Sequence, residues 1–232
     1  DAVKCAAFSP DGARVLTASR EGSARLWDAT SGACLRELSG HENAVNTAEF
    51  SPDGARLATA SNDSTARLWD STTGGCFEVL EGHATWVMSA RFAPNGASVL
   101  TASLDRTVRL WVLGEHSSAA CTRILRVCHA GMFVAGVFFA AFSPDGSRLV
   151  AASGGHGFGM ASIWSVESGE CLRMLEGHAA WVLSAGFSPD GGQLLTASGD
   201  GTAKLWSTDS GACLCSLEGH AHAVHDAVFS LA

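Results

Sequence analysis

Serine or threonine, histidine and aspartate are the residue types of a nucleophilic catalytic triad, and this chain contains them together more than once. Thr59 and Asp63 follow His41, and the same three types recur at the same spacing after His83 and after His178. A catalytic triad needs an oxyanion hole beside it, and the sequence has no Gly-X-Ser-X-Gly motif. The repetition favours a structural role for these residues, and we predict that the chain is not an enzyme.

A second group with possible chemistry lies near the end of the chain. His220, His222 and His225 follow Cys213 and Cys215, and imidazole and thiolate are the ligands that zinc prefers. The spacing matches no standard zinc motif, and alternation along a strand would place the histidines on different faces. We expect no bound metal and no cofactor, and a metal-dependent enzyme acting through the three histidines is the less favoured alternative.

The elements that position these residues are repeats of about 42 residues. Three series of residues share this period. They are Phe8, Phe50, Phe92, Phe142 and Phe187, which begin Phe-Ser-Pro-Asp-Gly or a close variant; Trp27, Trp69, Trp111, Trp164 and Trp206; and the histidines of Gly-His at His41, His83, His178 and His220. A sixth copy of the first series begins at Phe229.

Each repeat contains four short segments with the alternation of β-strands, such as residues 44–50, 55–61, 65–69 and 76–80. Pro-Asp-Gly between the first two segments supplies a fixed φ, a side-chain acceptor and a residue that tolerates positive φ. These residues predict a tight hairpin at that point. No segment has helical periodicity, so we expect an all-β fold.

Gly-His, Phe-Ser-Pro-Asp-Gly, Thr-Ala-Ser-X-Asp and Leu-Trp-Asp, in this order, resemble the WD40 repeat over nearly the whole chain. The resemblance implies a β-propeller of four-stranded blades with the first strand of each blade innermost. The chain would provide five four-stranded blades plus one extra innermost strand, and therefore an open or incomplete ring, because family members usually close with about seven blades. The expected blades are residues 1–39, 40–81, 82–127, 128–176 and 177–218, with the sixth-blade strand at 219–232.

The resemblance also implies a buried hydrogen-bonded set in each complete blade, formed by the Gly-His histidine, a strand-two threonine, a turn aspartate and the strand-three tryptophan. The implied sets are His41, Thr59, Asp63 and Trp69; His83, Thr101, Asp105 and Trp111; and His178, Thr196, Asp200 and Trp206. The serine two residues after the threonine, such as Ser61, is an alternative hydroxyl. Glu21 and Phe158 replace the aspartate in blades one and four, so these blades should be looser.

Four cysteines recur at one position of the repeat, at Cys34, Cys76, Cys171 and Cys213. A recurring position suggests packing, so we expect reduced, buried thiols. No secretory signal is visible after Asp1, and the chain is expected to begin inside a longer one. These features predict an intracellular protein, cytoplasmic or nuclear.

The charge and the apolar segments exclude other classes of partner. Fifteen lysines and arginines against 23 aspartates and glutamates give a formal net charge of −8, which opposes binding to nucleic acid. The longest apolar run, residues 132–142, is too short to span a bilayer, so no membrane partner is expected. The glycine-rich residues 154–159 lack the Gly-Lys-Ser/Thr of a phosphate loop and predict a mobile turn.

Residues that differ between repeats at equivalent loop positions are the candidates for partner binding. Trp86 and Trp181 each lie three residues after a Gly-His histidine, where blade two has Ala44. Tryptophan is frequent in binding hot spots, but packing between blades would also explain it at this position. The predicted surface is an apolar patch of Trp86, Met88, Leu104, Trp181 and Leu183, flanked by Asn46, Asn62 and Arg20.

We therefore predict a non-catalytic scaffold or adaptor that binds partner proteins or peptides through the loop face of the propeller. The alternative is a fragment that serves as the regulatory or targeting domain of a larger, possibly enzymatic protein. Missing blades or a second copy of the chain would then complete the ring.

Overall fold

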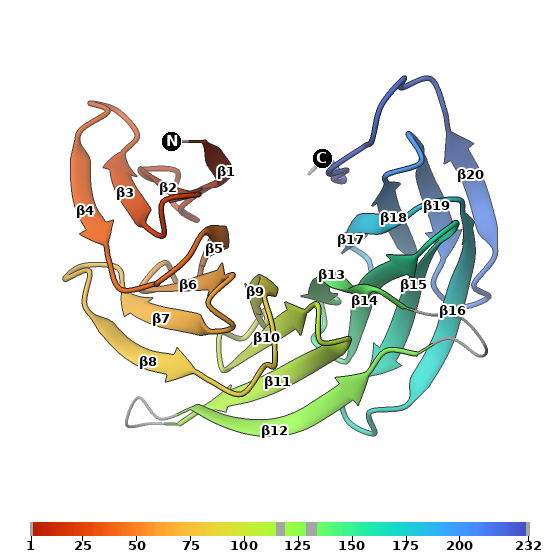
Figure 1. The fold of residues 1–232 in the computed structure, drawn as a ribbon, viewed down its shortest axis with the longest axis horizontal. Helices are drawn as coiled ribbons and strands as arrows, with labels where there is room; N and C mark the ends of the chain where they lie inside the picture. The colour runs from red at the N-terminus through yellow and green to blue at the C-terminus, as the bar shows by residue number, and fades with distance from the viewer. Residues whose placement is uncertain (1, 115–118, 129–133, 231–232) are drawn as a thin grey trace. The chain divides into compact units, whose positions relative to one another are not determined.

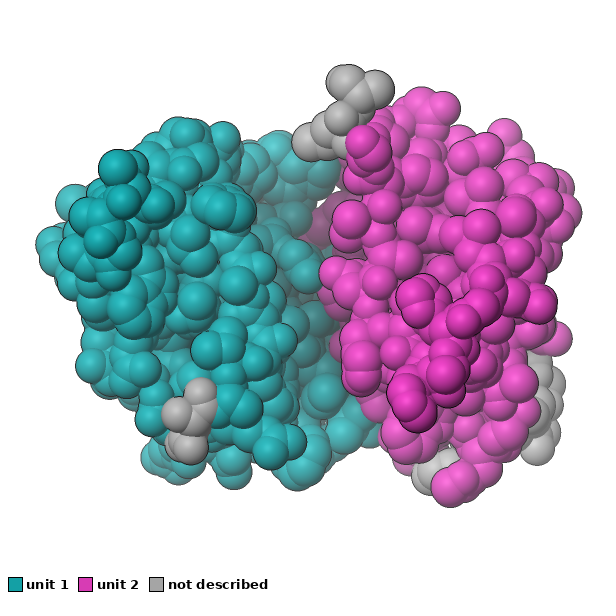
Figure 2. Space-filling view, turned by 90° about the horizontal axis from the view of Figure 1, so that it is seen from above, with its two compact units in different colours: residues 1–105, 109–122 teal, residues 106–108, 123–232 magenta. Residues whose placement is uncertain are grey.

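The computed structural model describes residues 2–114, 119–128 and 134–230. Within these residues the chain forms strands and no helix, and the strands group into five four-stranded antiparallel sheets, as predicted (Figure 1). Two compact units are distinguished, residues 1–105 with 109–122 and residues 106–108 with 123–232, called unit 1 and unit 2 below (Figure 2).

Unit 1 contains two complete sheets and most of a third, and each sheet follows chain order. The strands are β1 (Val3–Phe8), β2 (Arg14–Ser19), β3 (Ala24–Asp28) and β4 (Cys34–Leu38); β5 (Val45–Phe50), β6 (Arg56–Ser61), β7 (Ala66–Asp70) and β8 (Cys76–Leu80); and β9 (Val87–Phe92), β10 (Ser98–Ser103), β11 (Thr107–Leu113) and β12 (Ala119–Arg126).

Unit 2 contains the fourth and fifth sheets, again in chain order. Their strands are β13 (Gly136–Phe142), β14 (Arg148–Gly155), β15 (Phe158–Ser165) and β16 (Cys171–His178); and β17 (Val182–Phe187), β18 (Gln193–Ser198), β19 (Ala203–Ser207) and β20 (Cys213–Leu217).

The Ser-Pro-Asp-Gly segment forms the tight hairpin predicted between the first two strands of a sheet. In the second sheet the Ser51 hydroxyl donates to Asp53 Oδ1 at 2.5 Å and accepts from the Arg56 N–H at 2.9 Å. Asp53 Oδ1 also accepts from the Ala55 N–H at 3.0 Å, and Gly54 has a φ of 69°. The motif therefore fixes the start of β6, and with it the register of the residues that follow.

The hydrophobic cores lie between neighbouring sheets. Leu16 and Leu26 of the first sheet cluster with Val45, Leu57 and Trp69 of the second. A matching cluster joins the second and third sheets, and another joins the fourth and fifth. Each sheet is thus stabilised mainly by its neighbour, as in other repeat architectures.

An arginine that begins the second strand connects adjacent sheets. The Arg14 guanidinium lies over the Phe50 ring, 5.3 Å from its centroid, and donates to the Gly54 carbonyl at 3.0 Å. Arg56 contacts Phe92 in the same way, and Arg148 contacts Phe187, each at 5.7 Å. A cation–π contact combined with a hydrogen bond to the neighbouring hairpin thus recurs in both units.

Two expectations from the sequence differ from the structure. The first is the extra strand. Residues 222–229 carry no strand assignment, and no strand within the described residues pairs with them; residues 231 and 232 of the expected strand lie outside the described residues. The segment is tied to the fifth sheet by the Val224 N–H, which donates to the Ser198 carbonyl at 2.9 Å.

The second difference concerns the recurring cysteines. Cys34, Cys76, Cys171 and Cys213 are free thiols but are exposed, not buried. Each begins the fourth strand of its sheet, which has a neighbouring strand on one side only and faces solvent on the other. The recurrence of these cysteines correctly showed that they occupy equivalent positions in the sheets, but it did not show whether those positions are buried.

The glycine-rich segment, predicted to be a turn, lies in a β-hairpin. Residues 154–159 form the paired end of the β14–β15 hairpin, in which Gly154 pairs with Gly159 and Gly155 with Phe158. The turn itself is His156 and Gly157, and Gly157 has a φ of 78°. The added residues lengthen both strands of this hairpin, so that β14 and β15 have eight residues each.

A turn residue in the second sheet offers a stability test. Ser64 has a φ of 73°, whereas Gly22 and Gly201 occupy the equivalent turns of the first and fifth sheets. Glycine adopts positive φ without the steric cost that a side chain imposes. We expect Ser64→Gly to raise the free energy of unfolding by about 0.5–1 kcal/mol in chemical denaturation, since the relieved strain exceeds the added entropy of the unfolded chain. Ser64→Ala keeps the strain and should bring no gain, and a loss of stability in the glycine variant would contradict this account.

Candidate functional site

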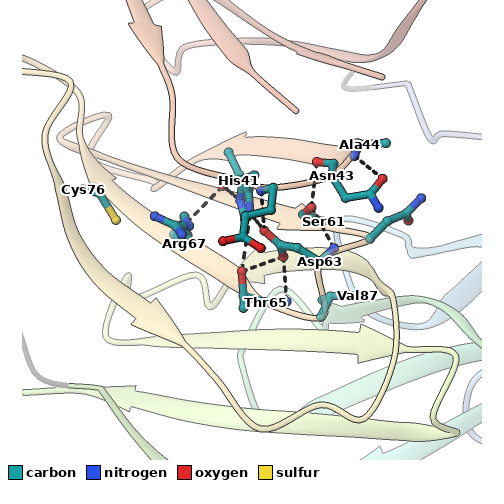
Figure 3. Close-up of polar contacts among 12 residues, drawn as sticks. His41, Asn43, Ala44, Ser61, Asp63, Thr65, Arg67, Cys76 and Val87 are labelled. Atoms are coloured by element: carbon teal, nitrogen blue, oxygen red, sulfur yellow. Dashed lines mark hydrogen bonds and ion pairs between the residues drawn. The ribbon is translucent and has the colours of Figure 1, made fainter. Parts of the chain in front are cut away.

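The structure brings the residues of the second-sheet polar set together. His41 Nδ1 lies 2.7 Å from Asp63 Oδ2, and His41 Nε2 lies 2.8 Å from Thr59 Oγ1. The Trp69 indole N–H donates to the same Thr59 oxygen at 2.9 Å. Figure 3 shows His41 and Asp63 directed toward each other, with Thr65 donating to the far carboxylate oxygen at 2.7 Å.

The third and fifth sheets repeat this geometry. His83 lies 2.8 Å from Asp105 and 2.7 Å from Thr101, while His178 lies 2.9 Å from Asp200 and 2.8 Å from Thr196. The indoles of Trp111 and Trp206 each donate to the threonine of their own sheet at 2.9 Å. The alternative hydroxyl of the second set, Ser61, instead donates to the Asn43 carbonyl at 2.9 Å.

A neutral imidazole satisfies every polar group of such a set. The tryptophan N–H donates to the threonine oxygen, the threonine O–H donates to Nε2, and the Nδ1–H donates to the aspartate. The three histidine side chains are 1%, 0% and 1% exposed, and Thr59, Thr101 and Thr196 are each 0% exposed. A nucleophile must be reachable by its substrate, so these hydroxyls are placed to hold tryptophans in position.

Burial controls the protonation of the set. Desolvation lowers the pKa of His41, His83 and His178, and the nearby cations Arg67, Arg109 and Lys204 respectively lower it further, against the opposing effect of the aspartates. Burial raises the pKa of Asp63, but hydrogen bonds from Thr65 and His41 outweigh it and hold that pKa below its usual value. The folded state therefore favours the neutral imidazole beside a charged carboxylate.

These shifts predict a pH dependence of stability. The unfolded chain begins to bind protons at His41, His83 and His178 as the pH falls below about 6.5, whereas in the folded chain the lowered pKa of these three histidines delays their protonation to lower pH. The unfolded state then binds more protons, so the free energy of unfolding falls with falling pH until the folded-state pKa values are reached. Thermal unfolding measured from pH 7.5 to 5.0 should show a falling midpoint, with a weaker dependence in His41→Gln. A midpoint that rises or stays level over this range would contradict the neutral assignment.

The first and fourth sheets lack the complete set. Trp27 donates to the Thr17 hydroxyl at 2.8 Å, with Glu21 at the place of the aspartate. Trp164 donates at 2.8 Å to Ser162, a hydroxyl that comes from its own strand. Both tryptophans are only partly buried, whereas Trp69 and Trp206 are 1% and 2% exposed.

Unit 1 holds six of the eight residues predicted for partner binding. Trp86 is 47% exposed, and its carbonyl accepts from the Leu104 N–H at 3.1 Å, so these two residues lie side by side. Met88, Leu104 and Asn62 are half-buried and Arg20 is exposed. This group presents one exposed indole with apolar side chains beside it, and it is called the unit 1 rim below.

Asn46 was predicted to lie on the exposed surface, but the structure buries it. It is 8% exposed, and its amide donates to Asn62 Oδ1 at 2.7 Å and to the Val87 carbonyl at 2.8 Å. Its Oδ1 accepts from Lys4 Nζ at 2.7 Å. These bonds connect three neighbouring sheets, so the amide serves to join them and is not available to a partner.

Lys4 was not singled out in the sequence, although the repeat places it at the same position as Asn46 and Met88. Burial lowers the pKa of Lys4, and the neighbouring Arg20 lowers it further. The signal that could have identified Lys4 is the 42-residue spacing from Asn46, applied to polar positions as well as to apolar ones. Lys4 and Arg20 therefore place two basic side chains near each other at the edge of the unit 1 rim.

Unit 2 holds the other two predicted residues, Trp181 and Leu183. Trp181 is 41% exposed, and its ring stacks on Phe138 with centroids 5.3 Å apart and an interplanar angle of 22°. Packing and exposure, which the sequence offered as alternatives for this tryptophan, thus coexist. The ring is held from one side and remains open to solvent.

Trp181 and Leu183 line a cavity of about 490 Å³, called the Trp181 cavity below. The other walls are the tip of the β14–β15 hairpin, the loop before β17, the residue after β18 and the C-terminal segment. These contribute Gly155, His156, Gly157, Ala180, Gly199, Ala223 and His225. This cavity was not predicted from the sequence, because its walls come from four separate segments.

The described residues show no metal site and no membrane-spanning helix. No group of three or more histidine, cysteine, aspartate or glutamate side chains in residues 2–114, 119–128 and 134–230 could hold a metal ion. In the same residues, no helix has the length and hydrophobicity that crossing a bilayer requires.

Comparison with known proteins agrees with the repeats seen in the structure. The family described as WD domain, G-beta repeat matches residues 1–28, 32–70, 74–112 and 169–207, more than half of the chain. Human WD repeat-containing protein 86 is 53% identical over 38 residues, which are 16% of this chain and 10% of that protein. Periodic tryptophan protein 2 of Saccharomyces cerevisiae is 54% identical over 35 residues, 15% of this chain and 4% of that protein, so each match spans a tenth or less of the relative. With five four-stranded sheets and a polar set repeated in three of them, the chain belongs to the WD40 repeat family.

Proposed function

We propose that this chain is a non-catalytic scaffold or adaptor that binds partner proteins or peptides through its loop face. The observation that carries the proposal is the state of Trp181, which is stacked on Phe138 yet 41% exposed beside a cavity. Such a ring loses little conformational entropy when a partner covers it, and tryptophan is enriched among residues that dominate binding energy.

The unit 1 rim supports the same function with a second exposed indole. Trp86 is 47% exposed next to the half-buried Met88 and Leu104, and Arg20 and Lys4 supply charge at the edge. An apolar centre with a polar border is the usual anatomy of a protein interface. The buried threonines of the polar sets offer no comparable access to a substrate.

The test compares partner capture by matched variants of the full chain. Trp86→Ala combined with Trp181→Ala should remove, by at least about tenfold, a defined set of proteins that the unaltered chain retains in quantitative affinity capture. Leu214→Ala is the control, because Leu214 is 52% exposed on β20 and belongs neither to the unit 1 rim nor to the lining of the Trp181 cavity. Capture of the same proteins by all three forms would overturn the proposal, provided that the double variant still unfolds cooperatively.

We further propose an intracellular setting, cytoplasmic or nuclear. Seven of the eight cysteines are exposed free thiols, and exposed thiols persist in reducing compartments. A role as the regulatory or targeting domain of a larger protein is compatible with this function, since the curated relatives are much longer than the segments that match. The intact mass of the native polypeptide would decide between the two forms.

A further inference from the structure

We infer that the Trp181 cavity is a specific pocket for one uncharged aromatic side chain of a partner peptide. This inference rests on the proposed function and names the chemistry that one part of the loop face recognises. The cavity volume of about 490 Å³ lies in the range of about 300–1,000 Å³ typical of ligand pockets. It exceeds what a small side chain would fill.

The composition of the walls selects against a charged occupant. Trp181, Leu183, Ala180 and Ala223 are apolar, and none of the described residues that line the cavity is an aspartate, glutamate, lysine or arginine. A charged side chain would lose hydration there without gaining an ion pair. The occupant must therefore be apolar or carry a single polar group.

The rings in the walls favour an aromatic occupant over an aliphatic one. Trp181 stacks on Phe138 on one side, and His156 and His225 line the cavity from two other segments. Ring stacking in offset or edge-to-face geometry adds to the burial of apolar surface. The same imidazoles can exchange hydrogen bonds with the amide groups on either side of the bound residue.

Glycines open the cavity at the positions where other repeats carry side chains. Gly199 follows β18, and its N–H donates to the Trp181 carbonyl at 2.9 Å, as the Leu104 N–H donates to the Trp86 carbonyl in the third sheet. The equivalent residues of the first two sheets are Arg20 and Asn62. The fifth sheet thus has no side chain at this position, and Gly199 lines the cavity beside Trp181.

This comparison provides a variant that fills the cavity without removing any wall. A Cβ at Gly199 would meet only the Ala180 Cβ at 3.6 Å and the Trp181 carbonyl oxygen at 3.7 Å, which are ordinary contacts. Gly199→Leu therefore places the side chain of the third sheet at the same point and should leave the fold intact. Gly192→Leu is the matched control, because Gly192 is exposed outside the cavity and the atoms nearest to a Cβ there belong to the Asp190 side chain, at 3.5 Å or more.

The experiment titrates the full chain with N-acetyl-phenylalaninamide, N-acetyl-leucinamide and N-acetyl-alaninamide. The readout is the indole N–H signals of the seven tryptophans in a ¹⁵N-labelled sample, with the Trp181 signal assigned from Trp181→Phe. We expect the phenylalanine amide to shift the Trp181 signal selectively, at least about tenfold more tightly than the other two amides. Gly199→Leu should abolish the shift, and Gly192→Leu should retain it.

Three results would overturn the inference. They are no shift of the Trp181 signal, equal binding of the leucine amide, and binding that persists in Gly199→Leu. The proposed scaffold function is tested separately from this pocket. If partner capture were lost in Trp86→Ala with Trp181→Ala but unchanged in Gly199→Leu, the scaffold function would be supported and the aromatic pocket would be contradicted.

Discussion

Thr59→Val should lower the free energy of unfolding by about 3 kcal/mol, although the two side chains have nearly the same shape. The change removes one hydroxyl that is bonded on both sides, by the Trp69 indole N–H at 2.9 Å and by His41 Nε2 at 2.8 Å. Thr59 is 0% exposed and Trp69 is 1% exposed, so water cannot replace the lost partner. Each orphaned buried group costs about 1–3 kcal/mol, and two are created here.

Thr17→Val in the same unit is the matched control. Thr17 bonds the Trp27 indole at 2.8 Å in a sheet that lacks the histidine, and both residues are only partly buried. One group is orphaned, and it can reach solvent, so the expected cost is about 1 kcal/mol. Chemical denaturation of the two variants measures the difference. Equal costs would show that the polar set contributes nothing beyond a single hydrogen bond.

The repeat predicted local structure well because each motif acts within its own neighbourhood. Ser51, Asp53 and Gly54 form their hairpin from bonds between residues at most five apart, and such bonds follow from sequence order alone. The four-stranded sheets and the all-β class follow from the same local rules. Family resemblance then supplied the longer pairing of His41 with Asp63, which lie 22 residues apart.

Burial and cavities could not be read in the same way, because they depend on neighbours that the repeat does not name. Asn46 has the pattern of a rim residue, yet Lys4 and Val87 from the adjoining sheets enclose it. Cys34 has the pattern of a packing residue, yet it begins an outer strand that no neighbour covers. The Trp181 cavity depends on four segments at once, and one of them is the inserted hairpin of the fourth sheet.

That hairpin approaches the loop before β17 closely enough to require glycine. A Cβ built on Gly159 would lie 1.9 Å from the Ala180 carbonyl oxygen and 2.9 Å from its carbonyl carbon. Both atoms belong to the backbone, so no side-chain rotation relieves the clash. Gly154 is similarly close to the Trp181 Cα, at 2.9 Å. The two glycines let the hairpin and the loop pack together and so set the position of Trp181.

Gly159→Ala should therefore destabilise the chain by about 3 kcal/mol or more and displace the loop that carries Trp181. Gly186→Ala on β17 is the control, since a Cβ there meets nothing within 4 Å and the equivalent residues of other repeats include Ala7 and Ala141. It should be neutral or stabilising by about 0.5 kcal/mol, because alanine reduces the entropy of the unfolded chain. Thermal and chemical unfolding give the stabilities, and the Trp181 indole signal reports the loop. If Gly159→Ala were as stable as Gly186→Ala with an unshifted indole signal, the close approach would not be what positions the tryptophan, and the cavity would need another explanation.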